Sequence, residues 1–583
     1  MVVIGIDLGT TNSLAVAYRD DQKGVELIPN QFGEFLTPSV VSMEGEEVLV
    51  GKVAKERLVT QSEATAHLFK PAMGQDQTFQ LGKRSYRPEE LSAAVLKQLV
   101  IDAESYLGEK VDELVISVPA YFNAEQRQAT KRAGELIGLK VERLINEPSA
   151  AAIACRNWNN QEDPKDFESF VVFDLGGGTL DISVVDCFEN VISIVSIAGD
   201  NHLGGSDFDR AIAQYAALEW GLDFESLSKQ EQRSLLLEAE RAKIRLQDSE
   251  ETLLSFKEDQ LVLSRSLVTA IAGPLLQRVQ KVLKKALVEG GMEPSELDSL
   301  IMVGGSSYSP VIRDYLIQTL RLPIVQKGNL DYLVAEGLGT YIAIKERQLL
   351  VKDLVVTDIC PFTLSTSIRN EQDLNKPLSS VLIPRNSVLP TSKKGYYSTT
   401  TPYQEYIQVD VRQGESLYAD ENLFLGSYRI SVTPRQEPYD FEVTYSYDIN
   451  SLLYVEIFIE ELNESHTLIL GDKKKLIPVE ELDHLRQIKE SSIQLAQLDE
   501  VQAVLEHAQR LYEEVPKHLQ AQVKRLILDY SARVMSYEHQ LKKKKEVTDQ
   551  MKEILERLEM HLNSQLRGFF QEWDYPGFED EEN

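Results

Sequence analysis

The stretch from Asp174 to Asp181 constrains the fold of this chain more than any other part of the sequence. It places three consecutive glycines and a threonine between two aspartates, with an apolar run at 170–173 before it and another at 182–185 after it. This pattern predicts a strand, a tight turn and a second strand. Because glycine has no Cβ, the N–H groups of such a turn can approach a bulky anion. The stretch therefore has the groups needed to hold a polyphosphate and its magnesium ion.

A second stretch of the same kind opens the chain, where Asp-Leu-Gly-Thr-Thr-Asn-Ser at 7–13 lies between apolar runs at 2–6 and 14–17. One copy alone would favour an ordinary hairpin. Two copies, together with glycine turns at 204–205 and 304–305, favour two similar lobes that close on one nucleotide. The chain has no Gly-x-x-x-x-Gly-Lys-Ser/Thr and no Gly-x-Gly-x-x-Gly that opens a helix. These absences exclude a P-loop site and disfavour a dinucleotide-binding fold.

The length and charge of the chain narrow its class. At 583 residues it is too long for one hydrophobic core, and we expect about three or four domains. Its 61 basic and 92 acidic residues give a net charge of −31, which argues against a general nucleic-acid or anionic-membrane surface. Three scattered cysteines and the lack of a membrane-length apolar run predict a cytoplasmic protein without a disulfide framework. The first residues predict a strand rather than a signal peptide.

The sequence pattern changes twice along the chain. Up to residue 350, apolar runs such as the strand expected at 37–43 alternate with helical periodicity, which predicts an α/β domain. A short apolar linker follows at 351–358. Alternation of apolar and polar residues with a period of two then predicts an all-β domain at 359–477. Helical periodicity returns at 478–583.

Six motifs occur in an order that carries a family resemblance. They lie at 6–13, 118–123, 145–148, 173–181, 202–205 and 303–306. With them, the chain resembles the seventy-kilodalton heat-shock chaperone family, the DnaK-like proteins, and is closest in style to the shorter HscC-like branch. The resemblance implies a multidomain fold: a two-lobed α/β ATPase domain of the actin-like, ribonuclease-H-like class, a β-sandwich that binds peptides, and an α-helical lid.

The resemblance also implies ATP or ADP and Mg²⁺ as cofactors. The residues it assigns to the phosphates are Gly9, Thr10, Thr11, Asn12, Gly176, Gly177, Gly178, Thr179, Gly204 and Gly205. Asp7, Glu147 and Asp174 would hold the magnesium ion mainly through its waters, since magnesium retains several waters in proteins.

The same resemblance assigns catalytic roles to Lys70, Glu147, Asp174, Thr179 and Asp181. Lys70 would place the attacking water and offset charge on the transferring phosphoryl group, although a lysine considered alone is usually a solvated surface residue. Either Asp181 or Asp174 would accept the proton, because phosphoryl transfer depends mostly on positioning and charge.

For the nucleoside, the matching residues are Glu240, Lys243, Gly304, Gly305, Ser306, Tyr308 and Asp331. Glu240 and Lys243 are three residues apart and share a helix face, so alone they would indicate a surface ion pair. Tyr308 stands where the family usually has an arginine that stacks on the base, and Gln247 replaces a small hydroxyl residue. Pro71 follows Lys70 where the family often has a basic residue. We expect the tyrosine ring to stack on adenine, with changed affinity and exchange rate.

Further matches concern coupling between domains. Pro119 and Arg127 match the family's proline relay and its contact, and Arg143 and Asp358 match positions that face a J-domain cochaperone. The docking linker matches at Asp353, Leu354, Val355 and Val356, with Thr357 in place of a leucine. Its apolar character disfavours a permanently exposed connector.

Four residues of the β domain match the family's peptide cleft. Ile407 and Val409 fit the strand that lines the cleft, and Tyr397 and Thr400 fit the arch over it. Such a cleft takes an extended peptide through backbone hydrogen bonds and a central apolar pocket. Ile407 would make this pocket smaller than a valine would. The alternative reading is that these are ordinary β-core residues.

Together these features predict an ATP-dependent chaperone that binds and releases extended apolar segments of unfolded proteins, with a J-domain cochaperone, a possible nucleotide exchange factor, no nucleic acid and no membrane as partners. One alternative is a weakly hydrolysing or non-hydrolysing family member that acts as an exchange factor. Another is an actin-like ATPase or sugar kinase that shares only the nucleotide fold. The predicted β domain and linker argue against an actin-like ATPase or sugar kinase.

Overall fold

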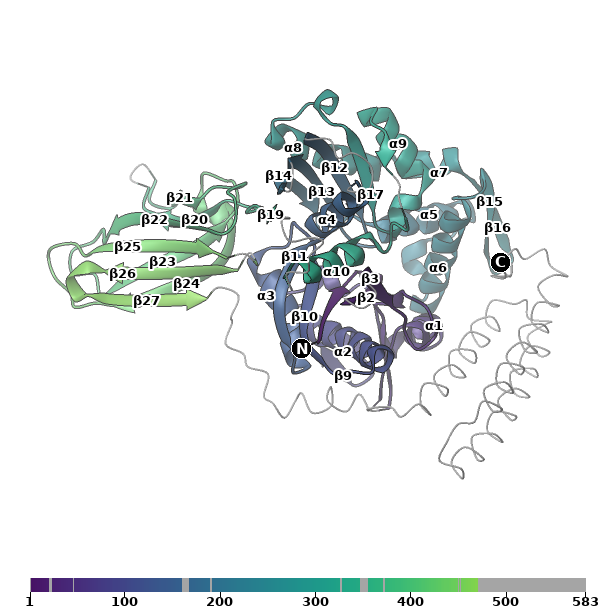
Figure 1. Cartoon of the computed structure of the whole chain (residues 1–583), viewed down its shortest axis with the longest axis horizontal. Helices are drawn as coiled ribbons and strands as arrows, with labels where there is room; N and C mark the ends of the chain where they lie inside the picture. The colour runs from purple at the N-terminus through teal and green to yellow at the C-terminus, as the bar shows by residue number, and fades with distance from the viewer. Residues whose placement is uncertain are drawn as a thin grey trace.

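The computed structural model in Figure 1 describes residues 2–19, 24–45, 47–159, 167–188, 191–325, 328–345, 355–370, 373–448, 450 and 452–469. The predicted helical domain at 478–583 and the linker residues Asp353 and Leu354 lie outside these ranges. None of the helices within the described ranges is long and apolar enough to cross a membrane.

The first lobe is built on a six-stranded sheet in the order β11-β10-β1-β2-β3, with β4 paired to β2. Its strands are β1 (Val2–Asp7), β2 (Asn12–Arg19), β3 (Gly24–Ile28), β4 (Thr37–Pro38), β10 (Val111–Val118) and β11 (Lys140–Asn146). β1 runs antiparallel to β2 and parallel to β10. Helices α2 (Pro88–Leu107) and α3 (Ala124–Leu136) contact each other beside this sheet.

The second lobe repeats this topology around the stretch that opened the sequence. Its sheet has the order β18-β17-β12-β13-β14-β19, and β12 pairs antiparallel with β13 so that Asp174 lies opposite Asp181. The strands are β12 (Phe167–Leu175), β13 (Leu180–Phe188), β14 (Val191–Asp200), β17 (Ser299–Val303), β18 (Ile324–Val325) and β19 (Val355–Thr357). As in the first lobe, an antiparallel meander of three strands is followed by parallel neighbours.

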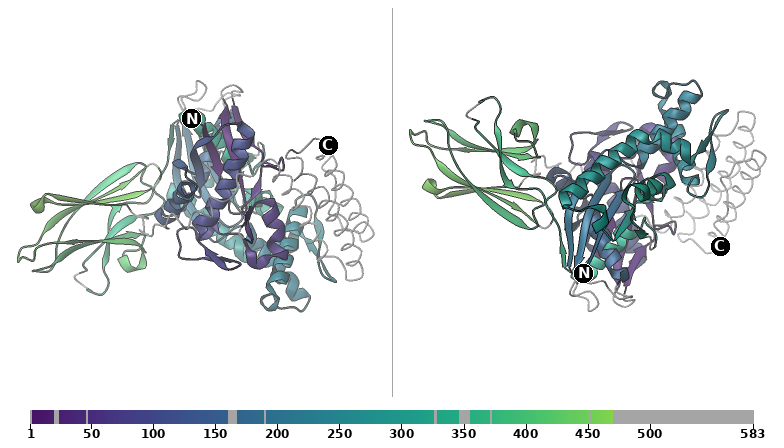
Figure 2. Two further views of the ribbon diagram at one scale, coloured as in Figure 1. Left: turned by 90° about the horizontal axis from the view of Figure 1, so that it is seen from below. Right: turned by 90° about the horizontal axis from the view of Figure 1, so that it is seen from above.

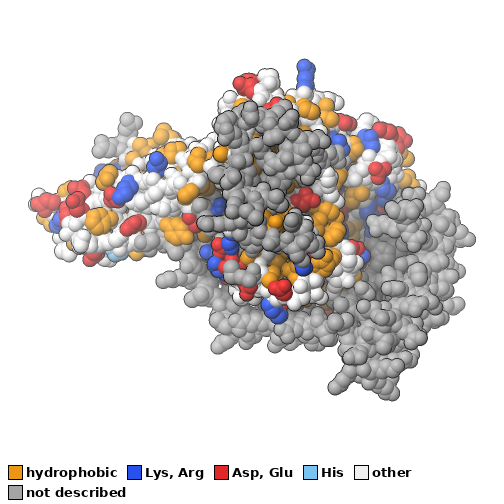
Figure 3. Space-filling view, viewed as in Figure 1, with side chains coloured by type: hydrophobic (Ala, Val, Ile, Leu, Met, Phe, Trp, Pro, Cys, Tyr) orange, Lys and Arg blue, Asp and Glu red, His pale blue; other side chains and the backbone are white. Residues whose placement is uncertain are grey.

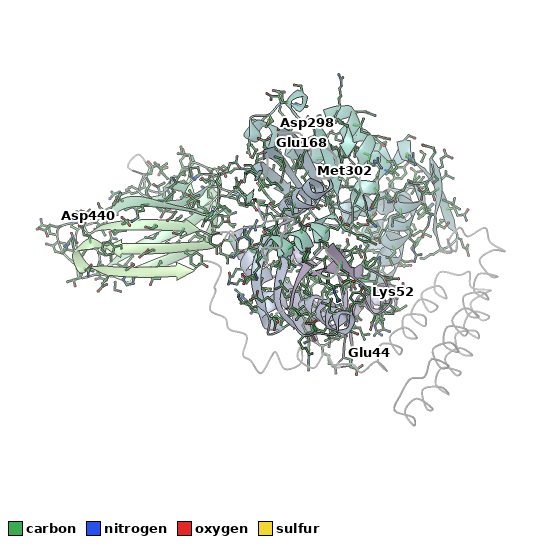
Figure 4. All side chains as sticks on the ribbon, in the orientation of Figure 1. Glu44, Lys52, Glu168, Asp298, Met302 and Asp440 are labelled. Atoms are coloured by element: carbon green, nitrogen blue, oxygen red, sulfur yellow. The ribbon has the colours of Figure 1, made fainter. Side chains whose placement is uncertain are left out.

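The two lobes share a core. Helices α4 (Glu147–Asn159) and α10 (Leu333–Lys345) contact each other, and α10 also packs on β1 and β2. One buried apolar cluster contains Val16 of β2, Val172 of β12 and Leu338 of α10. Figure 4 shows the separation of the lobes, with Met302 and Glu168 in one and Lys52 and Glu44 in the other. The cleft between the lobes therefore has a rigid floor made by both.

Further elements complete the two lobes. In the first lobe these are β5 (Val41–Glu44), β6 (Glu47–Val50), α1 (Lys52–Thr60), η1 (Ser62–Ala64), β7 (Thr65–Ala66), η2 (Lys70–Ala72), β8 (Phe79–Leu81) and β9 (Arg84–Tyr86). In the second lobe they are α5 (Gly205–Glu219), η3 (Phe224–Ser226), α6 (Lys229–Arg245), β15 (Glu251–Phe256), β16 (Asp259–Ser264), α7 (Arg265–Ile271), α8 (Gly273–Gly290), η4 (Pro294–Glu296), η5 (Gly305–Tyr308) and α9 (Pro310–Leu320). Helices α1 and α6 contact each other across the cleft.

The single strand expected at 37–43 is wrong in detail. The segment forms two short strands, β4 and β5, because Ser39 between them is not part of either strand. Its N–H donates to the carbonyl of Thr11 at 2.8 Å and its hydroxyl donates to the carbonyl of Gly9 at 2.8 Å. This tertiary contact ties the segment to the first glycine turn and outweighs the local strand pattern.

The β domain consists of two four-stranded sheets, β21-β20-β23-β24 and β22-β25-β26-β27. Its elements are β20 (Leu364–Ile368), β21 (Leu378–Ile383), β22 (Thr391–Ser398), β23 (Tyr406–Gln413), η6 (Ala419–Glu421), β24 (Leu423–Ser431), β25 (Asp440–Tyr447), β26 (Leu453–Ile459), η7 (Glu460–Leu462) and β27 (Glu464–Ile469). Alternate residues of both sheets share one apolar core. This arrangement is the sandwich that period-two alternation requires.

The β domain projects from the side of the two-lobed domain in all three ribbon views (Figures 1 and 2). Immediately before it, β19 adds to the edge of β14 as a parallel strand, with Val355 opposite Val191. The linker residues Val355, Val356 and Thr357 therefore belong to the sheet of the second lobe.

Over the described part of the β domain in Figure 3, acidic, basic and hydrophobic side chains are interspersed.

Candidate functional site

A cavity of about 610 Å³ lies between the two lobes. Its walls come from the β1–β2 turn, the β12–β13 turn, α1, α5, α6 and η5. Of the residues expected at a nucleotide, those that line it are Asp7, Gly9, Thr10, Thr11, Asn12, Lys70, Glu147, Asp174, Gly176, Gly177, Thr179, Gly205, Glu240, Lys243, Gly304, Gly305, Ser306, Tyr308 and Asp331. The fold therefore gathers into one cavity residues that are spread over more than three hundred positions of the sequence.

The two glycine turns press against each other at one end of the cavity. A Cβ added to Gly177 would lie 2.1 Å from Cγ2 of Thr11, and one added to Gly178 would lie 2.8 Å from Cγ2 of Thr10. A Cβ on Gly204 would meet the backbone of Gly178 at 2.3 Å. Glycine is required at these positions because no room is left for a side chain. The predicted residues Gly178 and Gly204 thus shape the turns from behind the cavity wall.

Four carboxylates gather beside these turns, at strand and helix ends. Asp7 ends β1, Glu147 begins α4, Asp174 lies near the end of β12, and Asp181 lies at the start of β13. Asp7 accepts a hydrogen bond from the hydroxyl of Ser117 at 2.6 Å. Asp181 does not line the cavity and is 1% exposed behind it.

Burial and mutual repulsion change the acidity of this cluster. Burial, followed by the charge of Glu147, raises the pKa of Asp7 to about 7. The same two causes raise the pKa of Asp181 to about 7, although the N–H of Tyr121 opposes the shift by donating at 3.0 Å. The pKa of Asp174 is raised as well, by burial and then by Glu147. Such a cluster is under electrostatic strain that a cation would relieve.

Lys70 supplies one cationic group to this cluster. Its ammonium lies 2.7 Å from Oε1 of Glu147, and the side chain is only 3% exposed. Leu68 has a φ of +52°, a left-handed conformation that is uncommon for leucine. The next residue, Phe69, is buried in the first lobe's core, and Lys70, two residues after Leu68, lines the cavity. The expectation of a solvated surface lysine is therefore excluded by its burial.

The acidic residues fit a hydrated magnesium ion. Asp7, Glu147 and Asp174 all line the cavity, and burial raises the pKa of Asp7 and of Asp174, which makes the charges of these two aspartates costly without a cation. Within the described ranges, no three His, Cys, Asp or Glu side chains are placed to hold a bare metal ion. A cation that keeps most of its waters and contacts few carboxylates is what magnesium prefers in proteins.

The other end of the cavity is formed by α5, α6 and η5. Lys243 lies 2.6 Å from Oδ1 of Asp209 and donates to the carbonyl of Gly205 at 3.0 Å. Lys243 thus pairs with Asp209 on α5, and not with Glu240, the pairing that the two residues considered alone would indicate. No sequence signal marked Asp209, because its partner lies 34 positions away on another helix (243 minus 209).

Tyr308 and Asp331 lie at this same end. The phenol of Tyr308 donates to Oδ1 of Asn329 at 2.8 Å and accepts from the N–H of Leu330 at 2.8 Å. Burial raises the pKa of Tyr308 and that of Asp331. The sequence did not identify Asn329 as a site residue, because its hydrogen bond to Tyr308 forms only when η5 lies next to the loop before α10.

One further residue that the sequence did not mark spans the cleft. Arg233 of α6 donates through Nη1 to the carbonyls of Leu58 at 3.0 Å and Ser62 at 2.7 Å. These carbonyls belong to α1 and η1, so the guanidinium joins the two sides of the cavity. Burial lowers the pKa of Arg233 from its usual value.

The predicted coupling residues lie between the cavity and the β domain. Arg127 is 1% exposed and donates to the carbonyls of Ala120 and Phe122 and to Oδ1 of Asn146. It thereby fixes the loop that follows Pro119. In that loop Tyr121, whose N–H contacts Asp181, packs its ring 4.4 Å from that of Phe362 in the β domain.

A second group of contacts joins the domains. Arg385 of the β domain lies 2.6 Å from Oε2 of Glu289 on α8. Asp358 accepts from the hydroxyl of Ser149 at 3.1 Å, and the N–H of Leu144 donates to Oδ1 of Asn450 at 3.1 Å.

The guanidinium of Arg143, the other residue expected to face a J-domain, lies 5.9 Å from the ring centroid of Tyr341. Val356 is half-buried against the core that the lobes share.

In the β domain, the predicted cleft residues differ in burial. Ile407 and Val409 are 1% and 2% exposed in the domain core, and Tyr397 packs against that core. The phenol of Tyr397 is 3.0 Å from the hydroxyl of Ser380. Thr400 is exposed. Three of the four residues therefore meet at one core, and Thr400 lies at the surface.

Comparison with known proteins agrees with this architecture. The model of the family described as Hsp70 protein matches residues 3–81 and 76–571. The protein named Chaperone protein DnaK from Thermosipho melanesiensis is 35% identical over 494 residues, which cover 81% of each chain. The protein of that name from Thermotoga maritima is 34% identical over 542 residues, 89% of this chain and 85% of that one.

A third relative, the Chaperone protein DnaK of Thermosipho africanus, is 36% identical over 494 residues and covers 81% of this chain. The match therefore extends through the two-lobed domain and the β domain alike. The chain belongs to the Hsp70 family and is a DnaK-like member of it.

Proposed function

We propose that the interlobe cavity binds ATP with magnesium and hydrolyses it, and that the β domain holds extended apolar segments of unfolded proteins. As a DnaK-like Hsp70 protein, the chain is an ATP-dependent chaperone and an ATPase. A sugar kinase or a non-hydrolysing exchange factor is accordingly not favoured. The observation that carries the proposal is the buried ion pair of Lys70 and Glu147 in a cavity lined by Asp7 and Asp174.

The phosphates would lie between the two glycine turns, where Thr10, Thr11 and Thr179 can donate hydrogen bonds. A bound Mg²⁺ would offset the charge that develops on the phosphate oxygens. Lys70 would position the attacking water and share in that offset, and Glu147 would hold Lys70 in place. Asp174 is the better candidate for the proton acceptor, because it lines the cavity whereas Asp181 lies behind it. Positioning and charge of this kind supply most of the catalysis in phosphoryl transfer.

The structural change caused by hydrolysis would be transmitted to the β domain through the loop after Pro119. Asp181 contacts the backbone of Tyr121, whose ring contacts Phe362, so a shift at the phosphates can be passed to the domain contact. Pairing of β19 with β14 supports a docked linker. Client peptide would bind the docked and released states with different affinity, which is the condition for coupling the two sites.

Arg143 and Asp358 would face a J-domain cochaperone near this contact. The carboxylate of Asp358 accepts from the hydroxyl of Ser149 and from the N–H of Ile359, and its backbone carbonyl accepts from the N–H of Leu389. A nucleotide exchange factor would act where α1 meets α6, since release of nucleotide requires the lobes to separate there. Ile407 and Val409 would form the floor of the client pocket, with Tyr397 beside it.

The test is single-turnover ATP hydrolysis by the full chain and by Lys70→Ala. The substitution should slow hydrolysis by about 100-fold or more while ATP still binds, as expected for the loss of one preorganised electrostatic group. Lys52→Ala is a suitable control, because Lys52 is 43% exposed, does not line the cavity, and contacts Glu34 and the ring of Phe32. Unchanged turnover in Lys70→Ala would contradict the proposal.

A second measurement addresses the client and the cochaperone. We expect an extended apolar peptide and a J-domain each to accelerate hydrolysis by the unmodified chain. Replacing Ile407 by Asp, which puts a charge in the core beneath the cleft, should abolish the peptide effect and leave basal hydrolysis unchanged. Hydrolysis that responds to neither addition would speak against the coupled cycle.

A further inference from the structure

A second cavity, of about 730 Å³, lies beside β3, at the edge of the first lobe's sheet. Its walls come from β3 and the segment that follows it, from the end of α2, and from α4 and α10. It has no lining residue in common with the interlobe cavity. Its apolar and aromatic walls include Val25, Leu27, Pro29, Phe35 and Ala154. A cavity of this size and lining is suited to a small organic molecule.

Close packing of backbones fixes one wall of this cavity. A Cβ added to Gly337 of α10 would lie 1.9 Å from the carbonyl oxygen of Ala150 on α4. One added to Gly339 would lie 2.5 Å from Cγ1 of Val25 on β3. The two glycines therefore bring α10 directly against α4 and against β3. Glu336, the neighbour of Gly337, lines the cavity from a backbone that cannot shift without disturbing these contacts.

Two glutamates line the cavity, Glu26 and Glu336, and the chain itself engages one of them. Oε1 of Glu26 accepts a hydrogen bond from the hydroxyl of Tyr106 at 2.7 Å. Oε2 of Glu26 lies 3.8 Å from Nε of Arg19. The negative charge of Glu26 is therefore offset by a guanidinium and a hydroxyl of the same lobe.

Glu336 differs from Glu26 in having no such partner. Its carboxylate makes no hydrogen bond or ion pair with any residue in the described ranges. None of the described residues that line the cavity is Lys, Arg or His. Burial raises the pKa of Glu336, and no neighbouring cation opposes the shift. A half-buried carboxylate without a compensating charge is costly, and a cation that enters the cavity would relieve this cost.

Two exposed aromatic rings line the same cavity. Phe35 and Tyr106 are 36% and 46% exposed. The ring of Phe35 packs edge-on against that of Tyr332, with 5.7 Å between the centroids and an angle of 76° between the planes. The hydroxyl of Tyr106 is held by Glu26. Aromatic faces attract organic cations, whereas a hydrated metal ion would gain little from apolar walls.

We propose that this second cavity binds a small organic cation, namely an ammonium or amidinium group on an apolar or aromatic body. Glu336 is the counter-ion of the positive group. The rings of Phe35 and Tyr106 contact the cation, and Val25 and Leu27 contact its apolar body. The site is separate from the proposed nucleotide site, with which it shares no lining residue.

The experiment titrates the full chain, without nucleotide, with benzamidine and with benzamide, which has nearly the same shape but no charge. Saturation-transfer NMR measures both affinities in about 0.15 M salt, which screens the general attraction of a cation to an acidic surface. Benzamidine should bind at least about tenfold more tightly, the effect of one charge-assisted hydrogen bond. In Glu336→Gln this preference should disappear through weaker benzamidine binding. Phe35→Leu should weaken benzamidine about two- to fivefold, as expected for one exposed cation–π contact.

Glu258→Gln is the matched control, since Glu258 is exposed in the turn between β15 and β16 and does not line the cavity. It removes the same charge from the chain and should keep the tenfold preference. The unfolding temperature of Glu336→Gln should equal or exceed that of the unmodified chain, because an uncompensated charge is removed, so that a loss of binding cannot be ascribed to unfolding. A preference that survives in Glu336→Gln, equal affinity of the unmodified chain for the two probes, or binding of neither probe would overturn the proposal.

Discussion

The two ends of the interlobe cavity hold their ligand groups by different means. At the phosphate end, the turns at Gly9 and Gly177 leave no space for a Cβ, so the backbone itself shapes the site. At the nucleoside end, side chains on α6 and η5 shape it, among them Lys243 and Tyr308. The comparison teaches that a site built from backbone leaves no room for an added side-chain atom, whereas a site built from side chains can change one group at a time.

The largest expected effect concerns the charge that makes the phosphate end distinctive. In the absence of nucleotide and metal, Asp181→Asn should raise the free energy of unfolding by about 2–4 kcal/mol at pH 8, since the shift in pKa from 3.8 to about 7 disfavours the ionised form. Because the folded-state pKa is above the unfolded one, the native chain binds more protons between these values. Its stability should therefore fall as pH rises from about 4 to about 7.

Thermal unfolding in a metal chelator, from pH 5 to pH 8, tests this prediction. The advantage of Asp181→Asn should shrink towards pH 5, where the wild-type carboxyl is largely protonated when folded. Asp298→Asn serves as a control, since Asp298 accepts an N–H bond from Ser169 at the opposite end of the sheet. An advantage for Asp181→Asn that does not vary with pH would contradict the assigned electrostatic strain.

The next effect tests the crowding of the glycine turns. Gly177→Ala should weaken ATP binding by about 100-fold, because a Cβ 2.1 Å from Thr11 forces the two turns apart. Calorimetric titration with ATP measures it. Gly273→Ala, at the start of α8 where a Cβ meets no atom within 4 Å, should bind ATP normally. Equal affinities for the two variants would remove the contrast between the ends of the cavity.

A smaller effect is expected at the contact that closes the cavity. Arg233→Ala removes the two hydrogen bonds to Leu58 and Ser62 and should speed release of bound ADP by about 10-fold, the worth of one to two charged hydrogen bonds. Stopped-flow release of a fluorescent ADP derivative provides the measurement. Lys229→Ala, an exposed change at the start of the same helix, should leave the release rate as it is.

The smallest effect is expected at the nucleoside end. Tyr308→Phe keeps the ring but removes its bonds to Asn329 and Leu330, so ATP affinity should fall only about two- to threefold as the ring becomes less fixed. Equilibrium binding of ATP measures the change. A loss as large as that of Gly177→Ala would show that the nucleoside end is as intolerant of change as the phosphate end.

Local signals in the sequence were sufficient for several elements of the fold. Asn123 is a residue type that commonly caps helices, and its Oδ1 accepts from the N–H of Gln126 at 2.9 Å at the start of α3. A Gly-Pro pair at 273–274 lies where α7 ends and α8 begins. Both features depend on neighbouring residues alone, which is why periodicity and capping patterns could identify them.

Sequence patterns did not predict the local structure or the contacts of residues whose hydrogen-bond or ion-pair partners are distant in the sequence. Ser39 breaks the strand expected at 37–43 because it bonds to the first glycine turn. Lys243 pairs with Asp209 on another helix, and Arg233 donates to carbonyls on the opposite side of the cavity. No pattern along the chain encodes these contacts, since each exists only after the lobes have come together.

By itself, then, the sequence determined the two strand–turn–strand units and the alternating strands of the β domain, because glycine geometry and hydrophobic periodicity are local properties of the chain. Its motifs also carried the family resemblance. Only the tertiary structure decided that Lys70 is buried beside Glu147, that the cluster of Asp7, Asp174 and Asp181 is electrostatically strained, and that Lys243 pairs with Asp209. The burial of a side chain and its interaction with distant charges depend on tertiary packing, and this packing forms only when segments far apart in the sequence come together.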